Sequence, residues 1–183
     1  MKTEIEQTFE IPIDELNLVE GCLKKNRSFQ KSLYYKYCDA MFTIIYRMLN
    51  DYDEANDVLQ EAFLQVFLKM DQFRRESSLG AWIKKIVVNV TLRHLKERKI
   101  FETFENNVQD TVNFIPDTID GAILEKIILA LPDGYRTIFL LVEVEGYKHR
   151  EVAEMLNISE GTSKSQLYYA KKLLKEKLKN EYL

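Results

Sequence analysis

The sequence predicts an all-α protein in which two small helical domains are joined by an extended acidic linker. Glycine and proline are scarce, at 6 and 3 of 183 residues, and an all-β sandwich or barrel needs more turn residues than that. Apolar residues make up 46% of the chain, which is enough to bury a core. These residues recur at helical spacing on both sides of a central stretch that has no sustained period.

The first helices are expected behind an amino-terminal arm of residues 1–20. Apolar side chains at helical spacing predict a helix over roughly residues 22–49. A second helix, over about residues 51–71, has the clearest amphipathic pattern in the sequence. Asp51 is a suitable cap for this helix, and Glu54 stands three residues later, as in a capping box.

A third helix is predicted to begin after Ser77 or Ser78, either of which can cap it, and to run to about Lys99. Its apolar residues share one face: Leu79, Trp82, Ile83, Ile86, Val87, Val90 and Leu95. Three helices joined by short loops make one compact domain, which we place at residues 21–99.

Residues 100–122 are predicted to form an acidic linker with little structure of its own. The second domain, residues 123–183, is expected to hold helices at about 123–131, 135–145, 149–156 and 161–179. The last two make the helix-turn-helix pattern, because a short helix, a three-residue turn and a longer basic helix follow one another. Asn157 opens that turn and is expected to be left-handed, a conformation that Asn tolerates better than most residues.

The net charge of −3 averages over a series of charged blocks. Residues 50–71 and 100–135 are acidic, with net charges of −5 and −6. Residues 21–49, 72–99 and 161–183 are basic, with net charges of +5, +6 and +4. The blocks at 72–99 and 161–183 are candidate nucleic-acid surfaces, although a charged block can also be a solvated helix face.

The closing helix combines a basic face with an apolar one. Lys164, Tyr168, Lys171 and Lys175 fall on one side, opposite Leu167, Ala170, Leu174 and Leu178. Ser165, Gln166 and Tyr169 add hydroxyl and amide groups near its start. Such a face suits the DNA major groove, where lysines meet phosphates and Gln can read adenine through two hydrogen bonds. The alternative is an ordinary solvated carboxy-terminal helix.

A second basic stripe lies on the predicted helix that ends near residue 99. Its members at helical spacing are Lys85, Asn89, Arg93 and Lys96. Arg74 and Arg75 precede it in a polar loop, so the stripe could hold a DNA backbone while the loop receives a base. Trp82 could stack on a base, but a Trp on an apolar stripe can equally belong to the core.

An acidic stripe marks the outer face of the predicted 51–71 helix. Asp53, Asp57 and Glu61 stand four residues apart, with Glu54 and Gln60 beside them. Like charges at this spacing destabilise a helix by roughly 0.2–0.5 kcal/mol per pair, and only the first turn is compensated by the helix dipole. Glu61 has no such compensation, so the stripe suggests a basic protein partner; a solvated face is the alternative.

The sequence contains no pattern for catalysis, a metal or a cofactor. His94 and His149 stand in different predicted domains, and there is no zinc-binding helix, phosphate loop or paired-cysteine motif. Cys22 and Cys38 are too few for a disulfide framework and suit a reducing compartment. No apolar run is long enough to span a bilayer, and the acidic start lacks a signal-peptide core. We therefore expect a cytoplasmic protein that is not an enzyme.

Several stretches together resemble the conserved regions of bacterial sigma factors. Residues 53–63 (DEANDVLQEAF) look like region 2.2, and residues 73–89 (FRRESSLGAWIKKIVVN) are similar to regions 2.3 and 2.4. LPDGYR at 131–136 and the run at 149–174 (HREVAEMLNISEGTSKSQLYYAKKLL) look like region 4. With no region 1.1 and no room for a folded region 3 between the halves, the order resembles the extracytoplasmic-function (ECF, group 4) sigma factors of the sigma-70 family.

The resemblance implies a transcription initiation factor that binds core RNA polymerase and directs it to specific promoters. Residues 21–99 would be the region 2 helical bundle and residues 123–183 the region 4 domain with its helix-turn-helix. The implied partners are the β′ clamp helices and β flap of core polymerase, promoter DNA and an anti-sigma factor. The acidic linker would thread through the polymerase interior.

The resemblance also implies a role for each charged surface. The residues that would dock on the clamp helices are Asp53, Glu54, Asp57, Gln60 and Glu61. Those that would contact the −10 element are Arg74, Arg75, Ser77, Lys84, Lys85, Asn89, Arg93 and Lys96, with a flipped base in the 73–78 loop. Those that would contact the −35 element are Lys164, Ser165, Gln166, Tyr168, Tyr169 and Lys172.

The chain departs from the family pattern at a few of these positions. Ser163-Lys164-Ser165-Gln166 stands where Val-Lys-Ser-Arg is frequent, and Tyr169 stands where Arg is common. Arg93 replaces a frequent Asp. These changes leave the preferred −35 and −10 sequences open. The alternative function is a stand-alone helix-turn-helix regulator that binds DNA without polymerase.

Overall fold

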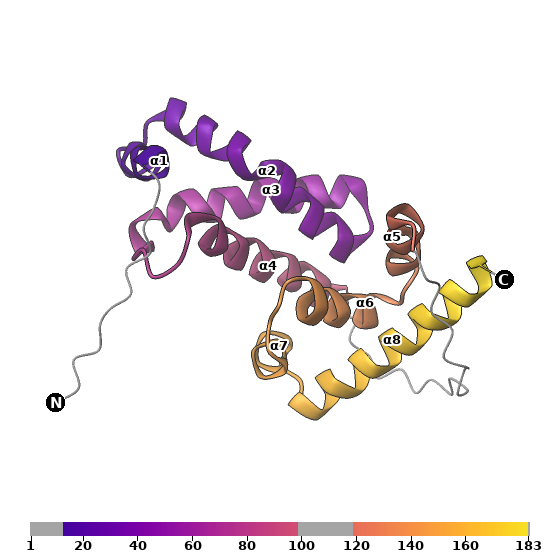
Figure 1. The fold of residues 1–183 in the computed structure, drawn as a ribbon. Helices are drawn as coiled ribbons and strands as arrows, with labels where there is room; N and C mark the ends of the chain where they lie inside the picture. Colours follow the sequence, from indigo (N-terminus) through magenta and orange to yellow (C-terminus); the bar gives the residue numbers. More distant parts are fainter. Residues whose placement is uncertain (1–12, 99–118, 183) are drawn as a thin grey trace. The chain divides into compact units, whose positions relative to one another are not determined.

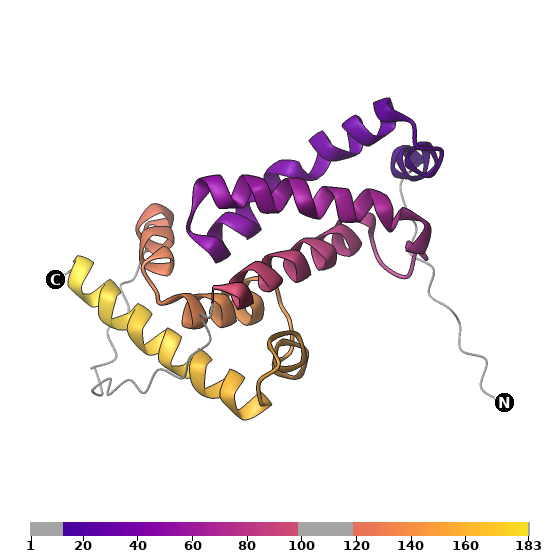
Figure 2. The same cartoon turned by 180° about the vertical axis from the view of Figure 1, so that it is seen from behind.

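The computed structural model describes residues 13–98 and 119–182, and within them the only regular structure is helical. The chain forms two compact units: residues 1–46 with 51–93, and residues 47–50 with 94–183 (Figures 1 and 2). Most of the predicted arm and linker lies outside the described residues. The predicted all-α class is confirmed, with a helix-turn-helix in the second unit.

The first unit is a bundle of four helices. They are α1 (Ile13–Leu23), α2 (Arg27–Leu49), α3 (Tyr52–Leu68) and α4 (Leu79–Glu97), with a 3₁₀ turn, η1 (Met70–Gln72), after α3. Its core is aliphatic, with Leu33, Ile45, Val58 and Ile83 fully buried. The predicted inward face of α3 is confirmed, and that of α4 is confirmed except at Trp82 and Ile86, which are half-buried.

The helix predicted over residues 22–49 is present as α2, but its start was placed too early, because a separate helix, α1, ends at Leu23 and α2 begins at Arg27. Helix α1 starts at Ile13, inside the segment predicted to be an arm, and crosses the proposed boundary at residue 20. A turn separates it from α2, since Lys25 is left-handed (φ 55°) and the Asn26 N–H donates to the Gly21 carbonyl at 3.0 Å. This is a helix-ending motif that usually has Gly at the left-handed position, so a Lys there did not indicate a helix end.

Helix α1 is held on α2 by polar contacts. The Tyr37 hydroxyl donates to Glu15 Oε1 at 2.7 Å, and Lys36 Nζ donates to Asp14 Oδ2 at 2.8 Å. Burial, with the Glu15 carboxylate beside it, raises the pKa of Tyr37 well above its ordinary value. The hydrogen bond from Lys36 lowers the pKa of Asp14. Tyr37 is thus neutral at physiological pH and acts as a hydrogen-bond donor between the helices.

The predicted caps of α3 and α4 are confirmed. Asp51 Oδ1 accepts from the Glu54 N–H at 2.9 Å, and Ser78 Oγ accepts from the Ala81 N–H at 3.2 Å, so Ser78 rather than Ser77 is the cap. Helix α3 ends at Leu68, somewhat earlier than predicted, where η1 begins the loop that leads to α4.

The second unit contains α5 (Gly121–Leu129), α6 (Asp133–Phe139), α7 (His149–Leu156) and α8 (Glu160–Tyr182). Helix α6 continues into a π-helical turn, η2 (Leu140–Val144), which Gly146 follows with φ 78°. Asn157 is left-handed, with φ 58°, as predicted for the turn between α7 and α8. The predicted inward residues of α8, from Leu167 to Leu178, are buried, so its apolar face packs on the unit.

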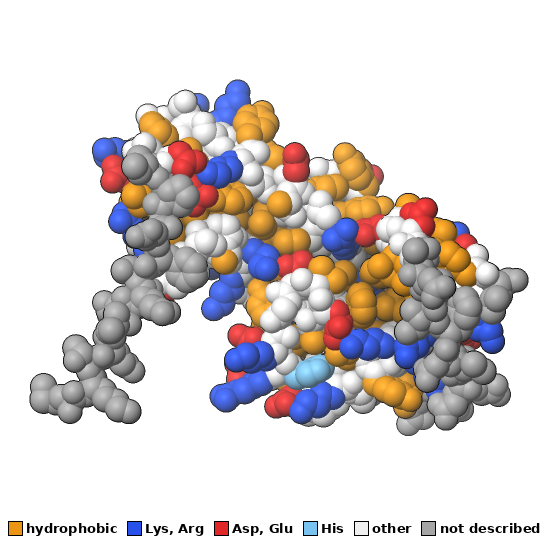
Figure 3. Space-filling view, viewed as in Figure 1, with side chains coloured by type: hydrophobic (Ala, Val, Ile, Leu, Met, Phe, Trp, Pro, Cys, Tyr) orange, Lys and Arg blue, Asp and Glu red, His pale blue; other side chains and the backbone are white. Residues whose placement is uncertain are grey.

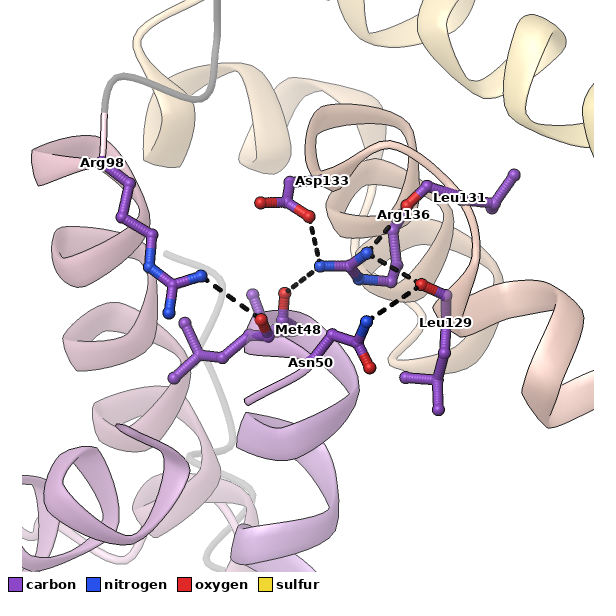
Figure 4. Close-up of polar contacts among 8 residues, drawn as sticks. Met48, Asn50, Arg98, Leu129, Leu131, Asp133 and Arg136 are labelled. Atoms are coloured by element: carbon purple, nitrogen blue, oxygen red, sulfur yellow. Dashed lines mark hydrogen bonds and ion pairs between the residues drawn. The ribbon is translucent and has the colours of Figure 1, made fainter. Parts of the chain in front are cut away.

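A buried arginine joins the ends of two helices in this unit (Figure 4). Arg136 is 2% exposed, and its guanidinium donates to the Leu129 carbonyl at 3.1 Å and the Leu131 carbonyl at 2.7 Å. It also pairs with Asp133 and donates to the Met48 carbonyl at 3.1 Å, at the end of α2 that belongs to the same unit. Arg136 therefore satisfies carbonyls at helix ends that have no partner inside their own helices.

Replacing this arginine should strongly destabilise the protein. Arg136→Leu removes the guanidinium and leaves buried carbonyls and Asp133 without their donor, so we expect a loss of roughly 3 kcal/mol in the free energy of unfolding. Urea unfolding followed by circular dichroism measures it. Arg150→Leu is the control, because Arg150 is 82% exposed and should cost less than about 1 kcal/mol. Equal effects of the two substitutions would contradict the bridging role.

Candidate nucleic-acid interface

The acidic stripe lies on the outer face of α3, as predicted. Asp53, Asp57 and Gln60 are exposed, whereas Glu54 and Glu61 are half-buried. The same face continues into two exposed leucines that the charge pattern did not reveal, Leu64 and Leu68, which are 61% and 73% exposed. The surface is therefore acidic in its first half and apolar in its second, which suits a partner with both basic and apolar side chains.

Glu61 is not uncompensated, contrary to the expectation from the helix pattern. Its carboxylate pairs with the guanidinium of Arg93, which reaches it from α4. The partner stands 32 residues away in the sequence, so a pattern confined to α3 could not reveal it. One ion pair therefore joins the acidic face on α3, through Glu61, to the basic stripe on α4, through Arg93.

A groove of about 140 Å³ lies between α3 and α4, next to this pair. Its lining combines an apolar floor with amide and cationic groups: Gln65, Lys69, Ile86, Asn89, Val90 and Arg93. Only Asn89 and Arg93 were expected here; Gln65 and Lys69 come from the helix that the sequence assigned to the acidic stripe. Amide groups beside apolar side chains suit the flat edge and face of an unstacked base.

The rest of the basic stripe is placed largely as predicted. Lys85, Asn89 and Lys96 are exposed on α4, whereas Lys84 is half-buried. In the loop before α4, Arg74 and Arg75 are exposed and Ser77 is half-buried. The Ser77 hydroxyl donates to the Ser78 carbonyl at 3.3 Å. Arg75 is left-handed, with φ 62°.

Trp82 packs inside the first unit. It is half-buried, and its ring lies 5.3 Å from the ring of Phe73, centroid to centroid. The two rings connect the start of α4 to the loop that precedes it. Of the two interpretations of Trp82, its place in the structure favours the packing role.

Helix α8, which is predicted to enter the DNA major groove, exposes part of the face expected to contact DNA. Lys164, Ser165 and Tyr168 are exposed, and Figure 3 shows basic side chains gathered around α7 and the start of α8. Lys164 pairs with Glu160 at 2.6 Å, and this hydrogen bond lowers the pKa of Glu160. Ser165 Oγ donates to the Thr162 carbonyl at 3.0 Å.

Three of the predicted −35 residues are less exposed than expected. Tyr169 and Lys172 are half-buried, and the Tyr169 ring lies 6.4 Å from that of Tyr135, inside the unit. The amide oxygen of Gln166 is buried and has no hydrogen-bond partner among the described residues. In this rotamer Gln166 cannot offer both amide atoms to adenine, because the buried oxygen faces away from solvent.

His149 holds the helix-turn-helix together, a role that the sequence did not indicate. Its Nδ1 lies 2.9 Å from the hydroxyl of Ser163, which is fully buried. This contact joins the start of α7 to the first turn of α8. Ser159 Oγ accepts from the Thr162 N–H at 2.9 Å and caps α8.

Comparison with known proteins identifies the family. Residues 33–100 match the model of sigma-70 region 2, and residues 122–174 match that of sigma-70 region 4. The chain belongs to the sigma-70 family. It is 27% identical to the ECF RNA polymerase sigma factor SigW of Bacillus subtilis over 160 residues, which cover 79% of this chain and 86% of that protein. It is also 27% identical to the RNA polymerase sigma-H factor of Pseudomonas aeruginosa, with coverage of 88% and 92%.

Solved structures share the fold of this sigma factor. The sigma factor RpoE of Bartonella quintana, solved in complex with the anti-sigma factor NepR, superposes with a TM-score of 0.54 at 21% identity. That alignment covers 81% of this chain and 96% of the other. CnrH, in complex with the cytosolic domain of CnrY, gives a TM-score of 0.51 at 15% identity, over 91% and 98%.

The matches place this protein among the ECF sigma factors, which are transcription initiation factors that work with RNA polymerase. The region 2 match contains the acidic face, the basic stripe and the groove between α3 and α4. The region 4 match contains the helix-turn-helix and ends at residue 174 within α8. Within residues 13–98 and 119–182, none of the helices has the length and apolar character needed to cross a membrane.

The Glu61–Arg93 pair should couple the two helices weakly and in a salt-dependent way. A double-mutant cycle of Glu61→Gln and Arg93→Gln should give a coupling of about 0.5 kcal/mol in the free energy of unfolding, because both side chains are partly exposed. The coupling should fall when the salt concentration rises to 1 M. A coupling of zero at low salt would mean that the ion pair does not persist in solution.

Proposed function

We propose that the acidic face of α3 docks this sigma factor on the clamp helices of core RNA polymerase. Asp53 and Asp57 are exposed, and Asp53, in the first turn of α3, is stabilised by the helix dipole. Leu64 and Leu68 extend the face with apolar area that no described side chain covers well. A helical partner with basic and apolar side chains matches both halves of this surface.

We further propose that the α4 stripe and the loop before it bind the −10 element. Lys85, Asn89 and Lys96 are on one exposed face, and the groove beside them has the chemistry for one unstacked base. Extrusion of a base costs a few kcal/mol, which stacking and hydrogen bonds in such a groove can offset. The observation that carries the proposal is this pairing of a basic face with an adjacent base-sized groove.

In the second unit, α8 is proposed to enter the −35 major groove. Lys164, Ser165 and Tyr168 lie on its exposed side, where they can contact phosphates and base edges. Gln166 reads a base only if its side chain turns outward from the rotamer seen here. Tyr169 and Lys172 then support the helix or reach the flanking backbone rather than reading bases.

The protein is proposed to act without catalysis of its own, in the compartment that holds RNA polymerase. The β flap is the proposed contact of the region 4 domain. The sigma factor of the Bartonella complex is bound to an anti-sigma factor, and we infer a partner of the same class here. The stand-alone regulator, which would need no core polymerase, is not favoured by the matches to both sigma-70 regions.

Charge reversal on α3 tests the docking surface. Asp53→Lys with Asp57→Lys should weaken binding to purified core polymerase by about tenfold, because two favourable charge contacts become repulsive. Fluorescence anisotropy of the labelled full-length protein measures the affinity. Glu61 is left intact because its reversal would also break the pair with Arg93.

The matched control reverses two exposed acids elsewhere, Asp39→Lys and Glu97→Lys, with the same change in net charge. Its affinity for core polymerase should stay close to that of the wild type. If the two variants lose the same affinity, the α3 surface is not the docking site. If the wild type neither binds core polymerase nor directs initiation, the sigma function itself is excluded and the stand-alone regulator is favoured.

Run-off transcription tests the −35 face. Promoters are first selected from genomic fragments with wild-type protein and core polymerase. Lys164→Ala with Gln166→Ala should then lower transcription about tenfold from promoters that depend on their −35 element. Lys177→Ala is the control, since it lies on α8 beyond the region 4 match. Unchanged −35 dependence would remove Lys164 and Gln166 from the site.

A further inference from the structure

A third basic cluster remains outside the surfaces described above. It surrounds the turn between α1 and α2 and consists of Lys24, Lys25, Arg27 and Lys31, which we call the turn cluster. All four side chains are exposed. They supply most of the positive charge of the 21–49 block, whose net charge is +5.

The turn that carries the cluster is tightly built. Asn26 N–H donates to the Gly21 carbonyl at 3.0 Å, and Asn26 Oδ1 accepts from the Ser28 N–H at 2.9 Å, which caps α2. The Phe29 ring packs against Gly21 so closely that a Cβ there would lie 2.1 Å from it. The backbone between the helices is therefore fixed, and the cations project from a defined scaffold.

The cluster is electrostatically unfavourable for the free protein. No acidic residue stands in the first turn of α2, so Arg27 lies uncompensated at the positive end of that helix dipole, whereas Lys24 and Lys25 follow the negative end of α1. In the described parts of the chain, no carboxylate lies within ion-pair distance of any member of the cluster. Among the described residues, the four cations are thus held together with no compensating charge.

The backbone conformation of Lys25 also destabilises the folded protein. Its φ of 55° is left-handed, a conformation that strains a side chain with a Cβ and is usually taken by Gly at a helix end. A Gly would relieve the strain but would remove a charge. A strained residue that keeps its charge in an already crowded cluster indicates a role for that charge.

Aromatic rings accompany the cations. Tyr35 is 63% exposed, and Lys31 Nζ lies 5.7 Å from the centre of its ring. Phe29 is 36% exposed on the same stretch of α2. Exposed rings next to cations are the features that bind single-stranded nucleic acid, since bases stack on the rings while the cations meet the phosphates.

The turn cluster belongs to the end of the first unit that carries the proposed −10 loop. Helix α1 contacts η1, the turn that leads directly into the loop with Arg74 and Arg75. Tyr37, on α2, lies against Gly80 at the start of α4, where a Cβ would be 3.1 Å from its ring. Figures 1 and 2 show α1, the start of α2 and the loop before α4 at the same end of the first unit, where a strand bound to the loop could reach both helices.

We propose that the turn cluster, with Tyr35, binds the single strand of the opened promoter beside the −10 element. The proposal rests on the proposed function, because it takes its strand from the same promoter. Continuity with the −10 loop favours a DNA strand over an acidic protein or an anionic membrane. Three phosphates in contact with Lys24, Arg27 and Lys31 would each contribute about 0.7 to the slope of affinity against salt.

The test uses the free full-length protein and a fluorescent 20-nucleotide oligothymidine in anisotropy titrations over a range of salt. The triple variant Lys24→Gln, Arg27→Gln, Lys31→Gln should bind about tenfold more weakly than wild type, and its salt slope should fall by about 2. Tyr35→Leu should weaken binding several-fold with an unchanged slope, because it removes stacking but no charge.

The matched control is Lys126→Gln, Lys177→Gln, Lys179→Gln, which removes the same charge from α5 and α8. It should retain at least half of the wild-type affinity. Equal losses in the two triple variants would overturn the proposal, since binding would then follow net charge alone. Tighter binding of the turn cluster to vesicles of anionic lipid or to a polyglutamate peptide than to the oligonucleotide would also overturn it.

Lys25→Gly separates function from folding. It should raise the Tm by a few degrees, because Gly relieves the left-handed strain, and it should lower the affinity for oligothymidine at the same time. A higher Tm with unchanged affinity would assign Lys25 to the turn alone and count against the proposal. Because this assay contains no polymerase, its failure is distinct from a failure of the wild type in run-off transcription.

Discussion

The second unit depends on one buried guanidinium. Helix α5 ends with carbonyls that its own backbone cannot satisfy, and Arg136 donates to that of Leu129 and to the carbonyl of Leu131 in the turn that follows. The same side chain belongs to α6, so its hydrogen bonds fix the direction in which α6 leaves the turn. Helix α8 packs on α6 and α7, and the position of the proposed reading helix therefore depends on a residue that is nearly inaccessible to solvent.

The first unit is constrained by charge rather than by one contact. Its bundle carries an acidic face on α3 and a basic face on the neighbouring α4, which are the surfaces proposed to bind polymerase and DNA. Burial of the aliphatic residues between α3 and α4 keeps the two faces apart. The groove lies at the border between them, where Lys69 of the acidic helix reaches the same space as Asn89 of the basic one. The groove exists only when α3 and α4 are packed together, because both helices contribute to its lining.

The local features of the fold could be predicted from the sequence, because each depends on residues close together in the chain. The Asp51 cap, the left-handed Asn157 and the buried faces of α3 and α8 are of this kind. The break between α1 and α2 could not, since Lys25 occupies a position where Gly is the usual signal. Three other features depend on packing between separate helices, which the pattern of a single helix does not contain. They are the ion pair of Glu61, the hydrogen bond between His149 and Ser163, and the buried oxygen of Gln166.

If the two proposed surfaces of region 2 bind as described, the Glu61–Arg93 pair links polymerase binding to DNA binding thermodynamically. A carboxylate shared by two cations binds each of them less strongly than it binds one alone. A polymerase side chain that takes Glu61 therefore frees the guanidinium of Arg93 at the edge of the groove, where a phosphate can replace the lost carboxylate. By reciprocity, a DNA phosphate that takes Arg93 leaves Glu61 a better acceptor for polymerase. Under the proposed function, exchange of this ion pair would favour DNA binding by the polymerase-bound factor, with no change of fold.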